Sequence, residues 1–150
     1  MYLRLPPRIK VLEALGAIAD GRIKIIDEHR AQVVSSEGDR VYDVYVDVSK
    51  GQVYSNDNGT KYRGYVGYPI IALLMIKGVI PFYRDVAEAL KGIPWRELNE
   101  KYKKYAIVES IVKDIARKRG ISPSYIDLVI SRVIGKLKTL KLKLLPSMPS

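Results

Sequence analysis

Few side chains in this sequence could carry out acid–base or nucleophilic chemistry. His29 is the only histidine and cysteine is absent, which excludes Cys–His pairs, thiolate metal sites and disulfides. The one acid–histidine cluster, Asp27-Glu28-His29, falls in an expected turn between two strands, so we interpret it as a hairpin connection. Glycine-rich phosphate loops are also missing. We therefore expect no catalytic residue, no cofactor and no metal, and a non-enzymatic protein.

The C-terminal part of the chain has the composition of a surface that binds a polyanion. Residues 94–150 carry 13 Lys/Arg against 5 Asp/Glu, whereas residues 1–93 carry 13 against 11. A basic region beside a nearly neutral one is typical of nucleic-acid-binding proteins. The alternative is an ordinary solvated, lysine-rich surface, and charge alone does not separate the two.

The segment 114–129, DIARKRGISPSYIDLV, resembles a bacterial-type helix-turn-helix. Ala116 is small enough for two helices to cross closely, and Gly120 allows a left-handed turn between them. The resemblance places the helix from Pro123 in the major groove of DNA; the alternative is an ordinary helical hairpin. Asp127 and the exposed Leu128 count against DNA contact. In this hypothesis Ser124, Tyr125 and Ser131 approach bases, while Arg117, Lys118, Arg119 and Arg132 contact phosphates.

Lysines and leucines alternate beyond this segment. We expect the helix from Pro123 to continue to about Leu144, with leucines on one face and cations on another. Such a helix could follow a nucleic-acid backbone, bind an acidic partner or a second copy of the chain, or lie on an anionic membrane. The further nucleic-acid-binding residues predicted here are Lys136, Lys138 and Lys143.

Residues 51–78 have the frame of a small zinc module without its ligands. A strand, a polar turn, a second short strand and an apolar helix of this size usually need a metal, held by a C-x-C pair and a C-x-H pair. Here those four positions hold Val53, Ser55, Val66 and Tyr68, none of which is a good zinc ligand. We expect tyrosine rings and aliphatic side chains to fill the volume of the lost metal.

The same region resembles the SWIM module. The resemblance covers residues 8–78 and depends on the order and spacing of AQVVSSEGDRVYDVYV, VYSNDNG and VGYPIIALLM. It implies a module that binds DNA or protein, here without zinc.

These residues must be positioned by an α+β fold. We expect an N-terminal helix that Pro6-Pro7 opens and Asp20-Gly21 ends, followed by a small antiparallel sheet of three to five strands and a helical C-terminal half. The predicted strands cover residues 22–26, 31–35, 40–48 and 51–55. The predicted later helices cover residues 68–78, 81–92, 95–119 and 123–144.

Ile93-Pro94 marks the expected boundary between a SWIM-like unit, residues 1–92, and a basic helical unit, residues 93–150; the two can share a core. The longest apolar run has 12 residues, fewer than the roughly 20 that a membrane span needs. Scarce Gln, Asn and Cys are typical of thermophiles, and we expect a cytoplasmic protein of a thermophilic archaeon.

Our leading hypothesis for function is nucleic-acid binding, to DNA rather than RNA. The alternative is a protein-interaction or homo-oligomerising subunit that uses the tyrosine-rich sheet and the Leu/Lys helix.

Overall fold

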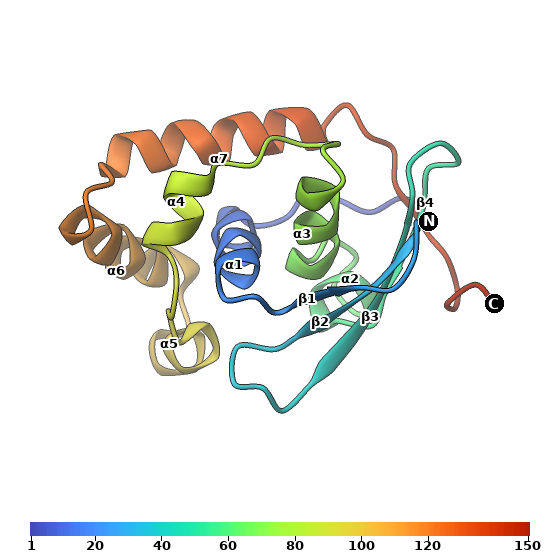
Figure 1. Cartoon of the computed structure of the whole chain (residues 1–150), viewed down its shortest axis with the longest axis horizontal. Helices are drawn as coiled ribbons and strands as arrows, with labels where there is room; N and C mark the ends of the chain where they lie inside the picture. The colour runs from blue at the N-terminus through green and yellow to red at the C-terminus, as the bar shows by residue number, and fades with distance from the viewer.

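The structure, a computed structural model, describes residues 1–150 and consists of one five-stranded sheet with helices packed on one face (Figure 1). The α+β class and the helical C-terminal half are thus confirmed. The elements in chain order are α1 (Arg8–Ala19), β1 (Ile23–Ile25), β2 (Arg30–Val34), β3 (Val41–Asp47), β4 (Gln52–Ser55), α2 (Asn58–Lys61), α3 (Tyr68–Ile76), α4 (Arg84–Ala89), α5 (Trp95–Tyr102), α6 (Tyr105–Lys118), α7 (Pro123–Leu137) and β5 (Lys143–Leu144).

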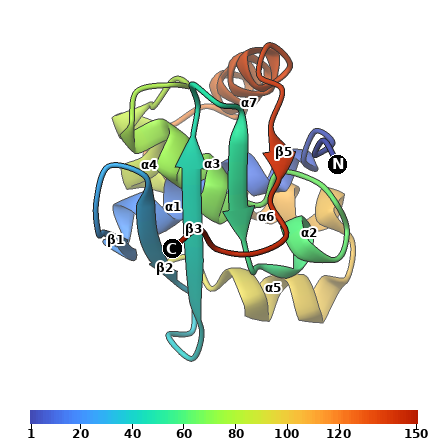
Figure 2. The same cartoon turned by 90° about the vertical axis from the view of Figure 1, so that its right-hand side faces the viewer.

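The sheet has the strand order β1-β2-β3-β4-β5 (Figure 2). Strands β1 to β4 form the expected antiparallel meander, and β5 pairs in parallel with β4. Side chains alternate across β3: Val44 and Val46 are buried beneath the helices, whereas Tyr45 between them is half-buried on the outer face. One face of the sheet therefore supplies the core, and helix α3 packs directly against β3 and β4 on that face.

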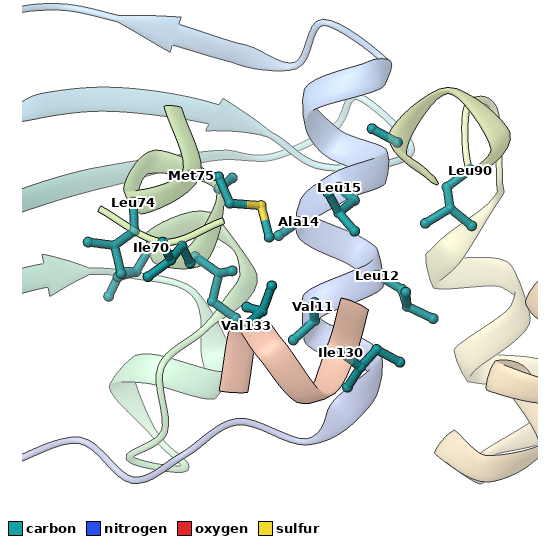
Figure 3. Packing of buried hydrophobic residues seen from close by; sticks show 14 of the residues in the cluster. Val11, Leu12, Ala14, Leu15, Ile70, Leu74, Met75, Leu90, Ile130 and Val133 are labelled. Atoms are coloured by element: carbon teal, nitrogen blue, oxygen red, sulfur yellow. The ribbon is translucent and has the colours of Figure 1, made fainter. Parts of the chain in front are cut away.

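Helix α1 lies at the centre of the molecule and is enclosed by other helices. Every residue from Val11 to Ala17 is buried. Figure 3 shows Val11 and Leu12 of α1 beside Ile130 and Val133 of α7. A single hydrophobic cluster of 33 residues includes side chains from both sides of Pro94, so the two predicted units share one core. None of the helices is both long and apolar enough to cross a membrane.

Three predicted helices are wrong in extent. The expected helix 81–92 is formed only over α4, Arg84–Ala89. The expected helix 95–119 is broken into α5 and α6 by Lys103, which adopts a left-handed conformation with φ 56°. The last helix ends at Leu137, well before the predicted Leu144. The chain beyond it turns to the sheet edge, because Leu142 is buried in the core and β5 pairs with β4. Lys138 and Lys143 therefore do not share a helix face with Lys136.

Candidate nucleic-acid interface and a polar cleft

Buried hydrogen bonds join the elements of the segment that resembles a zinc module. Val53 and Ser55 are fully buried on β4. Ser55 Oγ donates to Asp57 Oδ1 at 2.5 Å, and Asp57 Oδ2 accepts from the Thr60 N–H at 3.1 Å. Thr60 Oγ1 then accepts from the N–H of Gly67, the residue before α3, at 3.0 Å. Hydrogen bonds thus link β4 to α3.

The other two expected ligand positions flank Gly67. Val66 is 4% exposed, and Tyr68 begins α3, where burial raises its pKa to about 12. The second strand predicted before α3 is not formed, since Tyr65 makes only an isolated bridge to Arg4. No group of three or more His, Asp or Glu side chains is placed where it could hold a metal ion.

Asp27-Glu28-His29 forms the turn between β1 and β2, as predicted. Asp27 Oδ1 accepts from the backbone N–H groups of His29 at 3.0 Å and Arg30 at 2.8 Å. The hydrogen bond from the Arg30 side chain lowers the pKa of Asp27 to about 2. The carboxylate is therefore used to hold the turn.

The predicted helix-turn-helix segment forms a helical hairpin of α6 and α7. Ala116 and Ile126 are fully buried, and Gly120 has the expected positive φ, 95°. Ser122 caps α7 by accepting from the Tyr125 N–H at 3.2 Å. Helix α1 packs against both helices, so three helices surround a common core.

Asp127, which had counted against nucleic-acid binding, lies in an ion-pair network. Its Oδ1 is 2.6 Å from Arg8 Nη2 and 2.5 Å from Lys113 Nζ. The hydrogen bond from Lys113 lowers the pKa of Asp127, as the charge of Arg8 also does. Glu109 pairs with the same two cations. The carboxylate is therefore neutralised by cations of α1 and α6.

Several predicted nucleic-acid-binding residues make contacts within the protein. Arg119 Nη1 donates to the carbonyls of Ala89 and Lys91 at 3.0 and 2.8 Å, which ties the hairpin to α4. The Tyr125 ring packs edge-on against Tyr83, with centroids 6.2 Å apart. The remaining predicted residues near the turn also have local partners. Arg117 and Lys118 pair with Asp114, and Arg132 donates to the Tyr83 hydroxyl. The Ser124 hydroxyl lies 3.3 Å from that of Ser122.

The cations beyond Asp127 have no acidic partner. Residues 128–150 contain five Lys/Arg and no Asp or Glu side chain. All five are exposed and none is within ion-pairing distance of a carboxylate. They lie on α7, in the loop after it and on β5 at the sheet edge; Figure 2 shows this course of the chain from α7 to β5. We call this set the basic path: Arg132, Lys136, Lys138, Lys141 and Lys143.

A second feature, which the sequence did not reveal, is a cleft of about 600 Å³. It lies where α1 and the sheet meet α2, α5 and the start of α6. Its volume is within the range typical of small-molecule sites. The aromatic lining consists of Tyr42, Tyr65, Tyr68, Trp95 and Tyr105, and the cationic lining of Lys10, Arg22, Arg40, Arg63, Arg96 and Lys103.

Two buried polar atoms of the cleft lining have no hydrogen-bond partner, Trp95 Nε1 and Asn99 Oδ1, whereas Glu13 Oε2 lies 2.8 Å from Lys10 Nζ. Glu13 is 5% exposed and Trp95 is 2% exposed. Native proteins rarely leave such groups unpaired, because each costs about 1–3 kcal/mol. Both atoms have almost no accessible surface, and Trp95 Nε1 lies against Gly16 of α1, so they belong to the closed wall of the cleft.

Lys10 supplies the counter-charge to the buried carboxylate. Its Nζ lies 2.8 Å from Glu13 Oε2 and 5.2 Å from the centre of the Tyr105 ring. Burial alone would lower the pKa of Lys10, but the neighbouring Glu13 carboxylate outweighs this effect and raises it. Burial also raises the pKa of Tyr65 to about 12.

Two glycines allow the aromatic walls to approach. A Cβ at Gly16 of α1 would lie 2.8 Å from Trp95 Nε1, and one at Gly59 would lie 2.4 Å from the Tyr65 ring. One signal of the cleft is present in the sequence: Glu13 is a lone carboxylate within an otherwise apolar stretch of α1. A charged side chain on a helix that is buried on all sides indicates either an ion pair or a ligand-binding site.

Comparison with known proteins gives a family match. No curated protein and no solved structure matches this chain. A family model, described as Uncharacterised conserved protein UCP014422, matches residues 3–143, which include every helix and strand up to the start of β5. The chain therefore belongs to the family of uncharacterised conserved protein UCP014422.

Proposed function

We propose that this protein is a non-enzymatic nucleic-acid-binding protein, acting on DNA in preference to RNA, and that the basic path is its phosphate-binding surface. The observation that carries the proposal is that these five cations are exposed, lack a carboxylate partner, and lie in a segment with no Asp or Glu after residue 127. Most lysines and arginines around α1 and α6, in contrast, are neutralised by carboxylates. A row of unneutralised cations attracts phosphates and releases counterions on binding.

The geometry of α7 shapes this proposal. Ser124, Leu128 and Ser131 lie on its exposed side, and Arg132 and Lys136 lie beside them. Small polar side chains let a groove approach the helix, while the cations contact the backbone. Five phosphate contacts predict that log K falls with log salt with a slope of about −4 to −5.

The test is charge reversal on the basic path against a matched control elsewhere. Lys136→Glu/Lys138→Glu/Lys141→Glu changes the net charge as much as Lys24→Glu/Lys61→Glu/Lys101→Glu, and all six lysines are exposed. We expect the first triple variant to abolish most binding to a 20-base-pair duplex and to flatten the salt dependence, measured by fluorescence anisotropy. Equal loss in both triple variants would refute the assignment of the surface. Absence of binding by the unmodified protein to duplex and single-stranded probes at low salt would refute the function.

The alternative, a protein-interaction or homo-oligomerising subunit, is favoured by the outer face of the sheet. No helix covers this face (Figure 1), and Tyr45 of β3 pairs across the strands with Tyr54 of β4 upon it. The leucines of the C-terminal segment are less suited to this role, because Leu142 is buried in the protein's own core. If the lysine variants keep DNA affinity but lose an oligomeric state measured by light scattering, this alternative replaces the first proposal.

A further inference from the structure

We propose that the cleft between α1, the sheet and α5 binds a phosphate monoester through exposed cations of its lining. A phosphate monoester carries close to two negative charges at neutral pH and has three strong acceptor oxygens. The site is separate from the basic path, because none of the five cations of that path lines the cleft. It therefore does not depend on the proposed binding of DNA.

The lining of the cleft has more cations than carboxylates. Six lysine and arginine side chains line it, but only two acidic ones, Glu13 and Glu100. Half of these cations already pair with carboxylates: Lys10 with Glu13, Arg22 with Asp20, and Arg96 with Glu37 and Asp39. The others are exposed and lack a carboxylate within ion-pairing distance: Arg40, Arg63 and Lys103. The cleft thus keeps positive charge that a bound anion can neutralise.

The three unpaired cations come from separate parts of the chain. Arg40 precedes β3, Arg63 follows α2, and Lys103 separates α5 from α6. Like charges gathered on one cavity repel one another, and a cleft lined by one sign of charge concentrates ions of the opposite sign. Arginine and lysine together suit a phosphate, since the guanidinium group binds two oxygens at once and the ammonium group adds a point charge.

The backbone of Lys103 gives independent support. It is the one residue other than glycine with a positive φ, 56°, and all seven other positive-φ residues are glycines. Glycine is favoured in this conformation because a Cβ crowds the backbone. Other residues held in such conformations are concentrated at ligand-binding and active sites. The chain therefore keeps a lysine where glycine would fit better, and the side chain of this lysine lines the cleft.

The size and walls of the cleft indicate a ligand larger than inorganic phosphate. Its volume of about 600 Å³ is within the range of small-molecule sites. Tyr105, two residues after Lys103, lines the cleft and is 38% exposed, so its ring is open to contact. An aromatic group that carries the phosphate can pack on such a ring.

Isothermal titration calorimetry of the full chain at pH 7.5 (roughly the pH at which the phosphate is doubly charged) tests the ligand class. The probes are phenyl phosphate, inorganic phosphate and phthalate, an aromatic dicarboxylate of similar charge. We expect phenyl phosphate to bind at least about fivefold more tightly than either of the others, because only it combines a phosphate with an aromatic ring.

The phosphate monoester can belong to a free small molecule or to the end of a nucleic-acid strand. A single-stranded octamer with a 5′-phosphate is therefore compared with the same octamer ending in a 5′-hydroxyl, so that contacts to the basic path cancel. Tighter binding of the phosphorylated octamer identifies a strand end as the source. Equal binding of the two octamers, with binding of phenyl phosphate, identifies a free phosphate ester.

Two adjacent lysines provide a matched pair of variants. Lys103 and Lys104 are both exposed, but only Lys103 lines the cleft. Lys103→Gly is expected to weaken phenyl phosphate binding about fivefold or more, while its thermal unfolding midpoint stays the same or rises, because glycine adopts this φ readily. Lys104 is the N-cap of α6, a position that accepts glycine, and Lys104→Gly is expected to leave the affinity unchanged. Arg40→Ala/Arg63→Ala is expected to weaken binding about tenfold or more.

Three results overturn the proposal. The first is no heat with millimolar phenyl phosphate together with no gain from the 5′-phosphate of the octamer. The second is affinity for phthalate or inorganic phosphate equal to that for phenyl phosphate. The third is equal affinity of the Lys103→Gly and Lys104→Gly proteins for phenyl phosphate. Because the duplex assay measures the basic path and this assay measures the cleft, either proposal can fail while the other stands.

Discussion

Replacing Asp57 by alanine tests whether hydrogen bonds do the work that a metal does in a zinc module. Asp57 is 5% exposed and accepts from the Ser55 hydroxyl with one oxygen and from the Thr60 N–H with the other. The alanine variant leaves two buried donors without an acceptor. It also removes the cap of α2.

The expected loss follows from those two donors. A buried donor without a partner costs about 1–3 kcal/mol, so the pair costs about 2–6 kcal/mol. The free energy of unfolding of a whole domain is only about 5–15 kcal/mol. With a urea m value of about 2 kcal/mol per M, a loss of about 3 kcal/mol lowers the unfolding midpoint by about 1.5 M.

Urea unfolding followed by the emission of Trp95 and by far-ultraviolet circular dichroism measures this loss. Asp114→Ala is the matched control, since Asp114 is exposed and pairs only with Arg117 and Lys118 of its own helix. We expect little change in its midpoint. Asp57→Asn keeps one carbonyl oxygen for Ser55 and should recover part of the loss. The reasoning fails if Asp57→Ala unfolds at the same urea concentration as Asp114→Ala.

Three further changes test other parts of the structure. Gly16→Ala should destabilise the protein by about 1–3 kcal/mol and shift the Trp95 emission, because the new Cβ would collide with the indole. The control is Gly135→Ala on α7, whose Cβ would have no neighbouring atom within 4 Å, so this change should be neutral or stabilising in thermal unfolding. Leu142→Ala should lower the free energy of unfolding in urea by about 2–5 kcal/mol, because Leu142 is 4% exposed. Leu128 is 43% exposed, so Leu128→Ala should lower it far less. A larger loss in Leu128→Ala than in Leu142→Ala would contradict the observed end of α7. Burial acts to raise the pKa of Glu109, but hydrogen bonds from Arg8 and Lys113 outweigh it and lower that pKa, and the pKa of Asp127 is lowered in the same way. The stability that these two carboxylates contribute is present above their ordinary pKa values of 4.5 and 3.8, and it is lost as the pH falls through the lowered values. Glu109→Gln/Asp127→Asn should therefore lose less stability than the unmodified protein on acidification from about pH 6 to about pH 3, and an unchanged pH profile would contradict this.

Local signals in the sequence predict α1, the four antiparallel strands and the starts of α3 and α7. Proline at a helix start, glycine at its end and period-two alternation are short-range features, and here the tertiary structure agrees with them. The break at Lys103 has no such signal, because neither glycine nor proline marks it and both Lys103 and Lys104 are good helix formers.

The C-terminal strand illustrates an ambiguous pattern. Leu140, Leu142 and Leu144 alternate strictly with lysines, which is a strand period, yet the same segment also continues the helical spacing of α7. Pairing with β4, almost a hundred residues earlier in the chain, selects the strand over the helix. A rule that uses only neighbouring residues cannot predict that contact. The cleft was missed for the same reason: Glu13, Trp95 and Asn99 come from helices far apart in the chain.

The enclosure of α1 has a consequence for synthesis. Val11, Leu12 and Leu15 emerge from the ribosome early, but the α7 side chains that cover them, such as Ile130 and Val133, follow more than a hundred residues later. A nascent chain thus carries an uncovered apolar helix through most of translation, and such surfaces are where chaperones bind and where aggregation begins. The long sequence separation of these contacts also predicts slower folding than that of a simple helical bundle of equal length.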